Sequence, residues 1–421
     1  TGHRVVDHEA GCDAILFRDL SEIRADRAQP ILRQELARHP RTGQMQRMTK
    51  FIATGGFVPL GALLADGRPH PHAGTGFALS MGYGFPADLS SANPSHELRH
   101  DFHWWLELLQ LRFDGQRLLV TRREALEEKE LLPDWRVTAR GLGMAVPSGE
   151  GFLYGLVAGP ADGPEIPHWH PHCEPGLGRN LGSGVSRWEC GPTGWRPVNF
   201  QNLSGADLAF EPSLVRAADG ALYLTVRGKG SNAPPGELDD GLENTYEHFR
   251  VWRSTDEGVT WESVLHLPQQ RAPTPVVINR TASGQPYLSA NPYFPIIERD
   301  SLGKRVAQQM RREHHALWAL GPEGRSLASP VIVFDGPKVL GPAQQPPTMQ
   351  RENRWFLDHP IGAVLRLGDG QWHALQAMRM TDAAGTSEGA ELARGGGTWV
   401  EEVSDGLPAA ALPWTFAGVS A

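Results

Sequence analysis

The stretch that decides the fold is residues 250–262, RVWRSTDEGVTWE. Two short apolar runs flank a turn rich in Ser, Asp and Gly, which predicts a β-hairpin. We expect the side chains of Ser254 and Asp256 to fix the tip through hydrogen bonds to the backbone. Gly258 supplies the positive φ that such a turn needs. Trp261 then enters the second strand as a large apolar anchor, so the segment is first of all a structural clip.

The same hairpin pattern recurs along the chain. A Trp followed six positions later by a Gly occurs at Trp188 and Gly194, at Trp252 and Gly258, and at Trp318 and Gly324. The three Trp residues are 64 and 66 residues apart (252 − 188 and 318 − 252). Weaker copies lie at 111–115 and at 397–401, where Gly397, Trp399 and Glu401 resemble the turn glycine, the tryptophan and the glutamate of 258–262. A period of this length predicts a β-propeller with long loops and four-stranded antiparallel blades. We expect six blades, one of them closed by both chain ends. Five or seven blades, or a β-sandwich, are the alternatives.

Composition agrees with an all-β fold and excludes several classes of function. The 421 residues include 48 Gly, 34 Pro and 13 Trp, which favours many turns and strands over long helices. A formal charge of −8 does not provide the excess of positive charge that binding to nucleic-acid phosphates needs. No apolar run approaches the length of a membrane span.

The first 50 residues differ in texture from the rest. Between Ile15 and Arg38, Leu and Ile recur at three- and four-residue spacings among charged residues, which predicts a partly helical N-terminal extension over residues 1–50. The propeller domain is then expected over residues 51–421. The sequence begins at Thr1; if a leader has been removed, we expect a secreted or periplasmic protein.

The turns predict which loops share a face. In a propeller blade, strands A to D run outward, and the A–B and C–D turns lie on one face. We assign the A–B turns to the Gly-containing stretches at 65–67, 148–151, 218–220, 283–284 and 368–370. The long insertions then fall between strands B and C, at 84–106, 159–185, 228–249, 291–315 and 379–390. These loops are expected to surround the funnel at the other face.

Residues 254–261 fit the pattern Ser-x-Asp-x-Gly-x-Thr-Trp and resemble the Asp box of the sialidase-like (BNR-repeat) propellers. The resemblance implies a structural role for Ser254, Asp256, Gly258 and Trp261.

The same family supplies expectations for the site. Residues 210–227 look like the sialidase strand pair with an acidic residue at its start and a substrate-binding arginine at its end, here Glu211 and Arg227. Residues 287–318 are similar to the segment that supplies a further arginine, here Arg312. Arginine forks bind a sugar carboxylate through two charge-assisted hydrogen bonds. Solvated or inter-blade salt bridges are the alternative role for these arginines.

Two departures argue against a sialidase proper. The position of the nucleophilic tyrosine is occupied by Asp358 and His359, ahead of Pro360, and the first inner strand, residues 56–60, lacks the expected arginine. A histidine beside a carboxylate at the funnel is suited to general acid or base chemistry. The alternative is a turn or cap ahead of the proline.

The histidines of the predicted loops raise the question of a metal. His168, His170 and His172 alternate, so on an extended strand they face one side and converge on a divalent ion, zinc or calcium. His96 and His100 formally match the His-Glu-x-x-His pattern of zinc peptidases, although Arg99 lies within it. The alternatives are hydrogen-bonding loop residues or sugar contacts, with Trp169 as a stacking platform for a sugar ring. No cofactor is otherwise expected.

Three functions follow, each with an oligo- or polysaccharide as partner. The first is a glycoside hydrolase that cleaves an acidic, carboxylate-bearing glycan with Glu211 and Asp358 as paired carboxylates. The second is a polysaccharide lyase, in which arginines neutralise a uronate carboxylate and His or Tyr side chains move protons. The third is a non-catalytic glycan-binding propeller. The lyase reading relies on Arg227, Arg312, His359, His170, Tyr293 and Tyr246.

Overall fold

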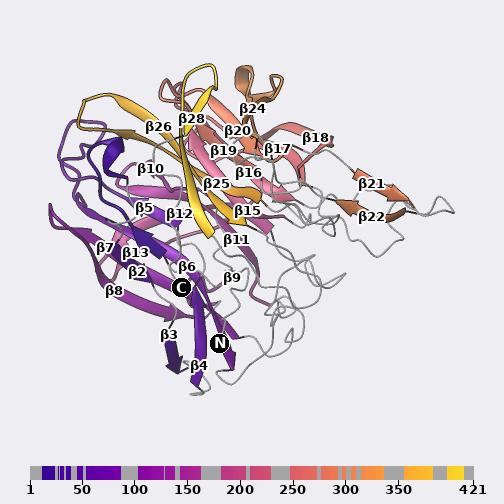
Figure 1. Cartoon of the computed structure of the whole chain (residues 1–421). Helices are drawn as coiled ribbons and strands as arrows, with labels where there is room; N and C mark the ends of the chain where they lie inside the picture. The colour runs from indigo at the N-terminus through magenta and orange to yellow at the C-terminus, as the bar shows by residue number, and fades with distance from the viewer. Residues whose placement is uncertain are drawn as a thin grey trace. The chain divides into compact units, whose positions relative to one another are not determined.

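The protein is all-β in the part of the chain that its computed structural model describes (Figure 1). The described residues are 12–23, 27, 29–32, 35–38, 45–50, 54–86, 103–127, 129–137, 143–162, 182–204, 209–228, 247–272, 276–292, 296–299, 305–309, 314–335, 355–382 and 396–411. Within them, the helical elements with defined bounds are the short 3-10 turns η1 (Leu20–Glu22) and η4 (Pro322–Gly324). No helix among these residues is long and apolar enough to cross a membrane.

The strands form five antiparallel sheets with the four-strand order of a propeller blade. Blades 1 and 2 belong to a first compact unit, which lies mostly between Glu22 and Ala206, and blades 3, 4 and 5 to a second, which lies mostly from Ser213 onward. Five is one of the blade numbers that the sequence left open. The described residues contain no blade that combines strands from both ends of the chain.

Blade 1 has a long second strand with two partners along one edge. β5 pairs with residues 76–79 of β6, and β4 pairs with residues 82–86 of the same strand. β3 extends this edge by pairing with β4. The strands are β3 (Glu35–Arg38), β4 (Met45–Lys50), β5 (Thr54–Phe57), β6 (Thr75–Pro86), β7 (His103–Phe113) and β8 (Leu118–Leu126).

Blade 2 is also widened by short strands. β9 pairs with β11 beyond the end of β10, and β14 pairs with β12 beyond the end of β13. The strands are β9 (Trp135–Val137), β10 (Val146–Ser148), β11 (Gly151–Pro160), β12 (Gly182–Gly191), β13 (Gly194–Pro197) and β14 (Gln201–Asn202).

The three blades of the second unit each have four consecutive strands, apart from one inserted hairpin in blade 4. Blade 3 consists of β15 (Ala209–Arg216), β16 (Leu222–Gly228), β17 (Glu247–Ser254) and β18 (Glu262–Ala272). Blade 4 consists of β19 (Val277–Arg280), β20 (Pro286–Ala290), β23 (His314–Ala319) and β24 (Val331–Asp335), with the hairpin of β21 (Ile296–Arg299) and β22 (Arg305–Gln309) inserted before β23. Blade 5 consists of β25 (Trp355–Arg366), β26 (Trp372–Asp382), β27 (Gly396–Val403) and β28 (Ala409–Ala411).

The strand order agrees with the loop positions expected from the sequence. Each predicted A–B turn joins the first and second strands of a blade, and each long insertion follows the second strand. One alignment was wrong. Residues 397–401 were matched to the turn and Trp261 of the hairpin at 250–262. In the structure Trp399 lies within β27, which is a third strand, and the turn to β28 follows at 404–408. Trp399 therefore corresponds to Trp252, because both residues lie on the third strand of a blade.

The turn at 254–261 contains the expected side-chain hydrogen bonds. Ser254 Oγ accepts from the backbone N–H of Gly258 (3.0 Å), and Asp256 Oδ1 accepts from that of Thr260 (2.9 Å). Gly258 has φ +80°. Trp261 Nε1 donates to the Gly258 carbonyl (3.1 Å), so the indole closes the turn just before β18 begins. These bonds, led by those from Thr260, lower the pKa of Asp256 to about 2.

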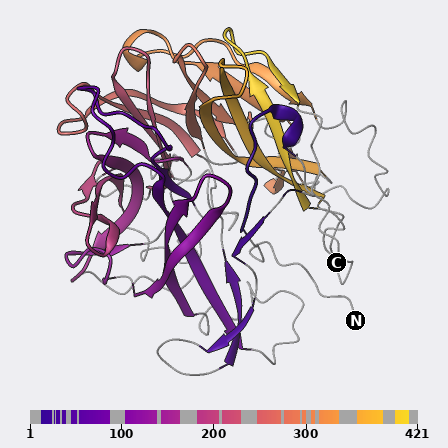
Figure 2. The ribbon, with the colours of Figure 1, turned by 90° about the vertical axis from the view of Figure 1, so that its left-hand side faces the viewer.

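The N-terminal segment is more extended than its composition predicts. Its helix in the described residues is η1, whereas β3 and β4 are strands, because pairing with the long β6 overrides the helix preference of Glu, Leu, Met and Arg. β1 (Cys12–Ala14) pairs with β2 (Gln29–Leu32). The Gly368 N–H donates to the Arg18 carbonyl (2.8 Å), and Figure 2 shows the indigo turn of η1 beside the yellow strands of blade 5. The domain boundary at residue 50 stays a prediction.

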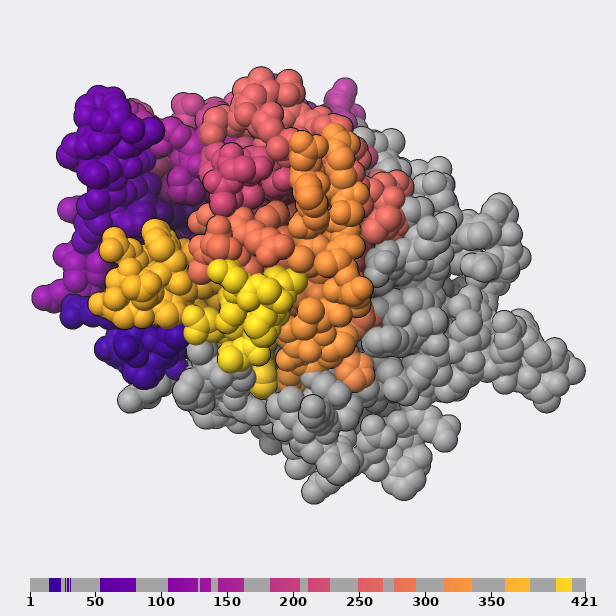
Figure 3. Space-filling view, turned by 90° about the horizontal axis from the view of Figure 1, so that it is seen from above, coloured from indigo at the N-terminus to yellow at the C-terminus, as the bar shows by residue number. Residues whose placement is uncertain are grey.

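Each unit has its own aromatic core. In the first unit Phe77 stacks on Trp188, with ring centroids 3.9 Å apart and planes within 3°. In the second unit Phe249 meets Trp318 edge to face at 5.0 Å. The fourth strand of blade 4 is at the surface: Val331 and Ile332 of β24 are 37% and 46% exposed. Figure 3 shows the orange part of the chain, to which this strand belongs, on the face in view.

Candidate active site

The structure describes two of the side chains that the resemblance assigns to the site, those of Glu211 and Arg227. Asp358 and His359 lie in β25, where Asp358 is paired with Arg379 and the register shifts before Ile361; their side chains lie outside the described part. The other candidates lie outside the described residues altogether: His168, Trp169, His170, His172, Tyr246, Tyr293 and Arg312.

Glu211 has an unusual backbone conformation. It lies in β15, is 3% exposed, and has φ +54°. Left-handed φ is unfavourable for a residue with a Cβ, and the residue before a proline, here Pro212, is normally held in the extended region. The other described non-glycine residues with positive φ, Glu257, Glu323 and Leu407, lie at turns. Such strain within a buried strand persists only where the surrounding structure imposes it, which is common at functional sites.

Arg227 lies near the end of β16, the second strand of the same blade. The hairpin turn is closed by the bond from Ala217 N–H to the Ala221 carbonyl (2.9 Å). Glu211 and Arg227 are each six residues from this closing pair (217 − 211 and 227 − 221), so the sequence carries both to the end of the hairpin far from the turn. Arg227 is 6% exposed. A buried guanidinium is rare unless it is paired, and Arg227 does have a partner in the structure.

The chemistry of these two groups is complementary. A carboxylic acid can donate or accept a proton or act as a nucleophile toward an anomeric carbon. A guanidinium offers five N–H donors in a planar fork that fits a carboxylate. Their burial lowers the local dielectric and strengthens their electrostatic effect on a bound group.

The structure also contains a buried polar network that the sequence did not reveal. At its centre is Gln376 on β26, which donates to Glu401 Oε1 (2.9 Å) and accepts from Asn279 Nδ2 (2.8 Å). His315 Nε2 lies 2.6 Å from Ser289 Oγ and 3.4 Å from Gln376 Nε2. These residues come from blades 4 and 5 and are at most 5% exposed, so the network joins two blades and is closed to a substrate.

Glu401 is the acidic member of this network. Trp399 Nε1 donates to its second oxygen (3.2 Å). Burial outweighs these hydrogen bonds and raises the pKa of Glu401 to about 7. A signal was present in the sequence, because the pattern Trp-x-Glu occurs on third strands at both 105–107 and 399–401. In blade 1 Trp105 Nε1 likewise donates to Glu107 (3.0 Å), but there Arg123 also binds the carboxylate, with Nε 2.7 Å from Glu107 Oε2.

The described residues do not form a metal centre. No group of three or more His, Cys, Asp or Glu side chains within them is arranged to hold an ion. The predicted ligands His168, His170 and His172, together with His96 and His100, lie outside the described residues, so the metal site stays a prediction.

Comparison with known proteins identifies no family. No protein-family model matches the chain, and no curated protein sequence matches it. Among solved structures it is similar to a protein of unknown function from Dyadobacter fermentans (12% identity, TM-score 0.43, covering 89% of this chain and 80% of that chain). It is similar to Trypanosoma rangeli sialidase in complex with sialic acid (9%, 0.39, 96% and 53%), so it spans about half of that protein's length. It is also similar to α-L-arabinofuranosidase from Lactobacillus brevis (8%, 0.38, 79% and 89%). The assignment of the blades rests on the strand pairing, and no activity is transferred from these proteins.

Proposed function

We propose that the protein is a glycoside hydrolase that acts on an acidic, carboxylate-bearing glycan. Glu211 takes part in cleavage, and Arg227 binds the carboxylate of the substrate. The observation that carries the proposal is the left-handed backbone of Glu211 inside a buried strand. A glutamate that served only to fill space would have no need of a conformation that costs about 1 kcal/mol or more.

Hydrolysis of a glycosidic bond needs a second carboxylate. One carboxyl group protonates the leaving oxygen, while the other attacks the anomeric carbon or activates a water. Asp358 is the partner that the sequence offers, and His359 beside it is the group that would assist proton transfer. We further propose Arg312, Tyr293, Tyr246, His170 and Trp169 as substrate contacts.

A digest of a panel of acidic polysaccharides tests the reaction class. The products are read for new reducing ends and for the absorbance of an unsaturated uronate. A hydrolase produces reducing ends without the unsaturated product. If unsaturated uronate accumulates, the reaction is β-elimination and the hydrolase proposal is wrong. Binding of the glycans without any product would make the protein a lectin.

Variants of Glu211 test the site itself. Glu211→Gln keeps the shape and removes the ionisable group, so kcat should fall by about 10²-fold or more. Glu211→Gly should lose activity equally while relieving the left-handed strain. The matched control is Glu323→Gly, because Glu323 has φ +53° in an exposed turn. That variant should gain about 1 kcal/mol of stability and keep full activity.

Substitution of Arg227 separates binding from chemistry. Arg227→Lys keeps the charge and loses the fork, so KM for a carboxylated substrate should rise while a neutral analogue is little affected. Equal effects on both substrates would show that Arg227 supports the fold and does not bind the carboxylate.

A further inference from the structure

Three blades of the second unit end their first strand with an arginine. The turn after each first strand is closed by a backbone hydrogen bond of the same spacing: Ala217 to Ala221 (2.9 Å), Thr281 to Gln285 (3.0 Å) and Leu367 to Gln371 (3.1 Å). The residue just before each closing pair is Arg216 in blade 3, Arg280 in blade 4 and Arg366 in blade 5. A cation is therefore repeated at the turn end of three successive first strands.

Blades 3 and 4 bring two of these arginines into the same region. Ser213 Oγ on β15 donates to the Ile278 carbonyl (3.0 Å) and accepts from the Ile278 N–H (3.2 Å) on β19. The turns themselves meet, because the Ala218 N–H donates to the Gly284 carbonyl (3.1 Å). The two strands are thus held side by side up to their ends at Arg216 and Arg280.

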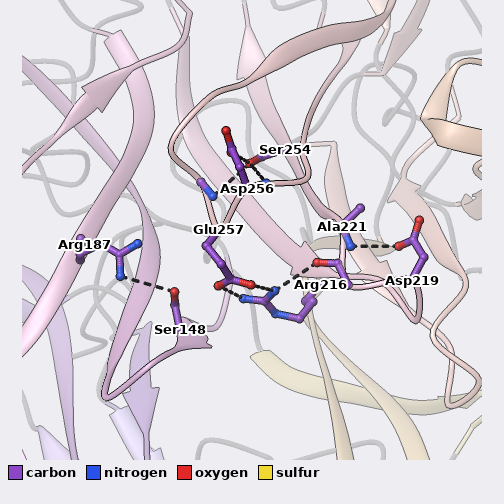
Figure 4. A network of polar contacts seen from close by, with 10 residues as sticks. Ser148, Arg187, Arg216, Asp219, Ala221, Ser254, Asp256 and Glu257 are labelled. Atoms are coloured by element: carbon purple, nitrogen blue, oxygen red, sulfur yellow. Dashed lines mark hydrogen bonds and ion pairs between the residues drawn. The ribbon is translucent and has the colours of Figure 1, made fainter. Parts of the chain in front are cut away.

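The three arginines differ in how their charge is compensated. Arg216 makes a two-pronged ion pair with Glu257, at 2.5 and 2.7 Å, and also donates to the Gly220 carbonyl (Figure 4). Arg366 is exposed and donates to the Gly370 carbonyl (3.1 Å). Arg280 makes no hydrogen bond or ion pair within the described part of the molecule, although it is half-buried.

The surroundings of Arg280 do not favour a cation. Burial, with the positive charge of Arg216 as a second cause, lowers the pKa of Arg280. Asp405 reaches the same turn, but its carboxylate accepts from the Ser283 N–H (3.3 Å) and forms no ion pair with Arg280. A partly desolvated charge without a partner is costly, and an added anion would remove that cost.

We propose that Arg280, with Arg216 beside it, binds a small oxyanion at the turn end of blades 3 and 4. The planar fork of a guanidinium matches the oxygens of sulfate, phosphate or a carboxylate. This position is at the end of β15 opposite Glu211, so it is separate from the proposed active site and does not depend on the proposed function.

Thermal unfolding at constant ionic strength tests the site. Sodium sulfate, sodium phosphate and sodium acetate are each titrated in the millimolar range against sodium chloride, below the concentrations at which sulfate acts by exclusion from the surface. For the wild type we expect a saturable rise in Tm with at least one oxyanion, about 2 °C or more at ten times its Kd. Comparison of the sulfate, phosphate and acetate titrations shows which oxyanion is preferred. Calorimetric titration with that anion should give the same Kd as the Tm measurements.

The variants decide whether Arg280 is responsible. Arg280→Gln should abolish the saturable rise and, without oxyanion, should melt at or above the wild-type temperature because it removes an uncompensated charge. Arg280→Lys should retain a weaker response, and Arg366→Gln, at the equivalent position of blade 5, a full one. The proposal is overturned if Arg280→Gln responds as the wild type does, if Arg366→Gln loses the response equally, or if the wild type shows no saturable rise.

Discussion

At the scale of single residues, the environment of Glu401 couples stability to pH. Its carboxyl group receives hydrogen bonds from two neutral donors, Gln376 and Trp399. Among the described residues it has no arginine partner such as Arg123 provides for Glu107. Because the pKa of Glu401 is raised from 4.5 to about 7, the folded state holds a proton there that the unfolded state has released. Between these pH values stability falls as pH rises, since the folded state binds more protons.

We therefore expect a stability difference that depends on pH between the wild type and Glu401→Gln. From pH 4.5 to 7 the wild type should lose about 3 kcal/mol relative to the variant, because each unit of pKa shift corresponds to about 1.4 kcal/mol. Urea unfolding at several pH values measures this. Glu189→Gln, the same substitution at an exposed site on a third strand, is the control. Parallel pH profiles for wild type and Glu401→Gln would contradict the raised pKa.

At the scale of elements, blades 3 and 4 contact each other through the turns that connect their first and second strands. Gly284 has φ +88°, and a Cβ there would lie 2.7 Å from Ala218 Cβ and 2.8 Å from the Ala218 nitrogen. Gly220 occupies the same place in the turn of blade 3, with φ +85° and open space around it. The two glycines therefore share a backbone conformation and differ in their contacts.

Alanine substitutions at Gly220 and Gly284 distinguish the cost of backbone strain from the contribution of the contact between the turns. Gly220→Ala should lose about 1 kcal/mol, the cost of a left-handed alanine. Gly284→Ala should lose at least about 1 kcal/mol more, because the new methyl group displaces the hydrogen bond from Ala218 to the Gly284 carbonyl. Chemical denaturation of both variants gives the difference. Equal losses would show that the contact between the turns contributes nothing to stability.

At the scale of the whole molecule, the described residues form two units with separate cores. The core of the first unit includes Phe77 and Trp188, and that of the second includes Phe249 and Trp318. A compact unit with its own core can unfold as a separate cooperative step.

We expect scanning calorimetry to reveal this when one core is weakened. Trp188→Leu should destabilise the first unit by about 2 kcal/mol or more and move one transition down, whereas Trp318→Leu should move the other. Trp372→Leu is the control, because Trp372 is 57% exposed. A single transition that shifts as a whole in both core variants would show that the units unfold together.

The sequence by itself determined what depends on neighbours in the chain. It correctly predicted the turn between the first and second strands of each blade, the hairpin at 252–261 and the five long insertions. These features depend on Gly, Asp and Ser, which act on the backbone within a few residues of themselves. The match at 397–401 failed because a Trp on a third strand and a Trp after a turn look alike over five residues.

Only the tertiary structure decided the features that depend on distant parts of the chain. The sequence did not predict the left-handed backbone of Glu211, the burial of the Glu401 carboxyl group or, among the described residues, the lack of an ion-pair partner for Arg280. Burial and charge compensation are properties of an environment assembled by folding. The Trp-x-Glu spacing at 105–107 and 399–401 indicates the hydrogen bond between the two side chains, but it does not tell whether an arginine also binds the carboxylate. For the same reason blade number, which depends on how the sheets pack, was left open by the sequence and fixed at five within the described residues by the strand pairing.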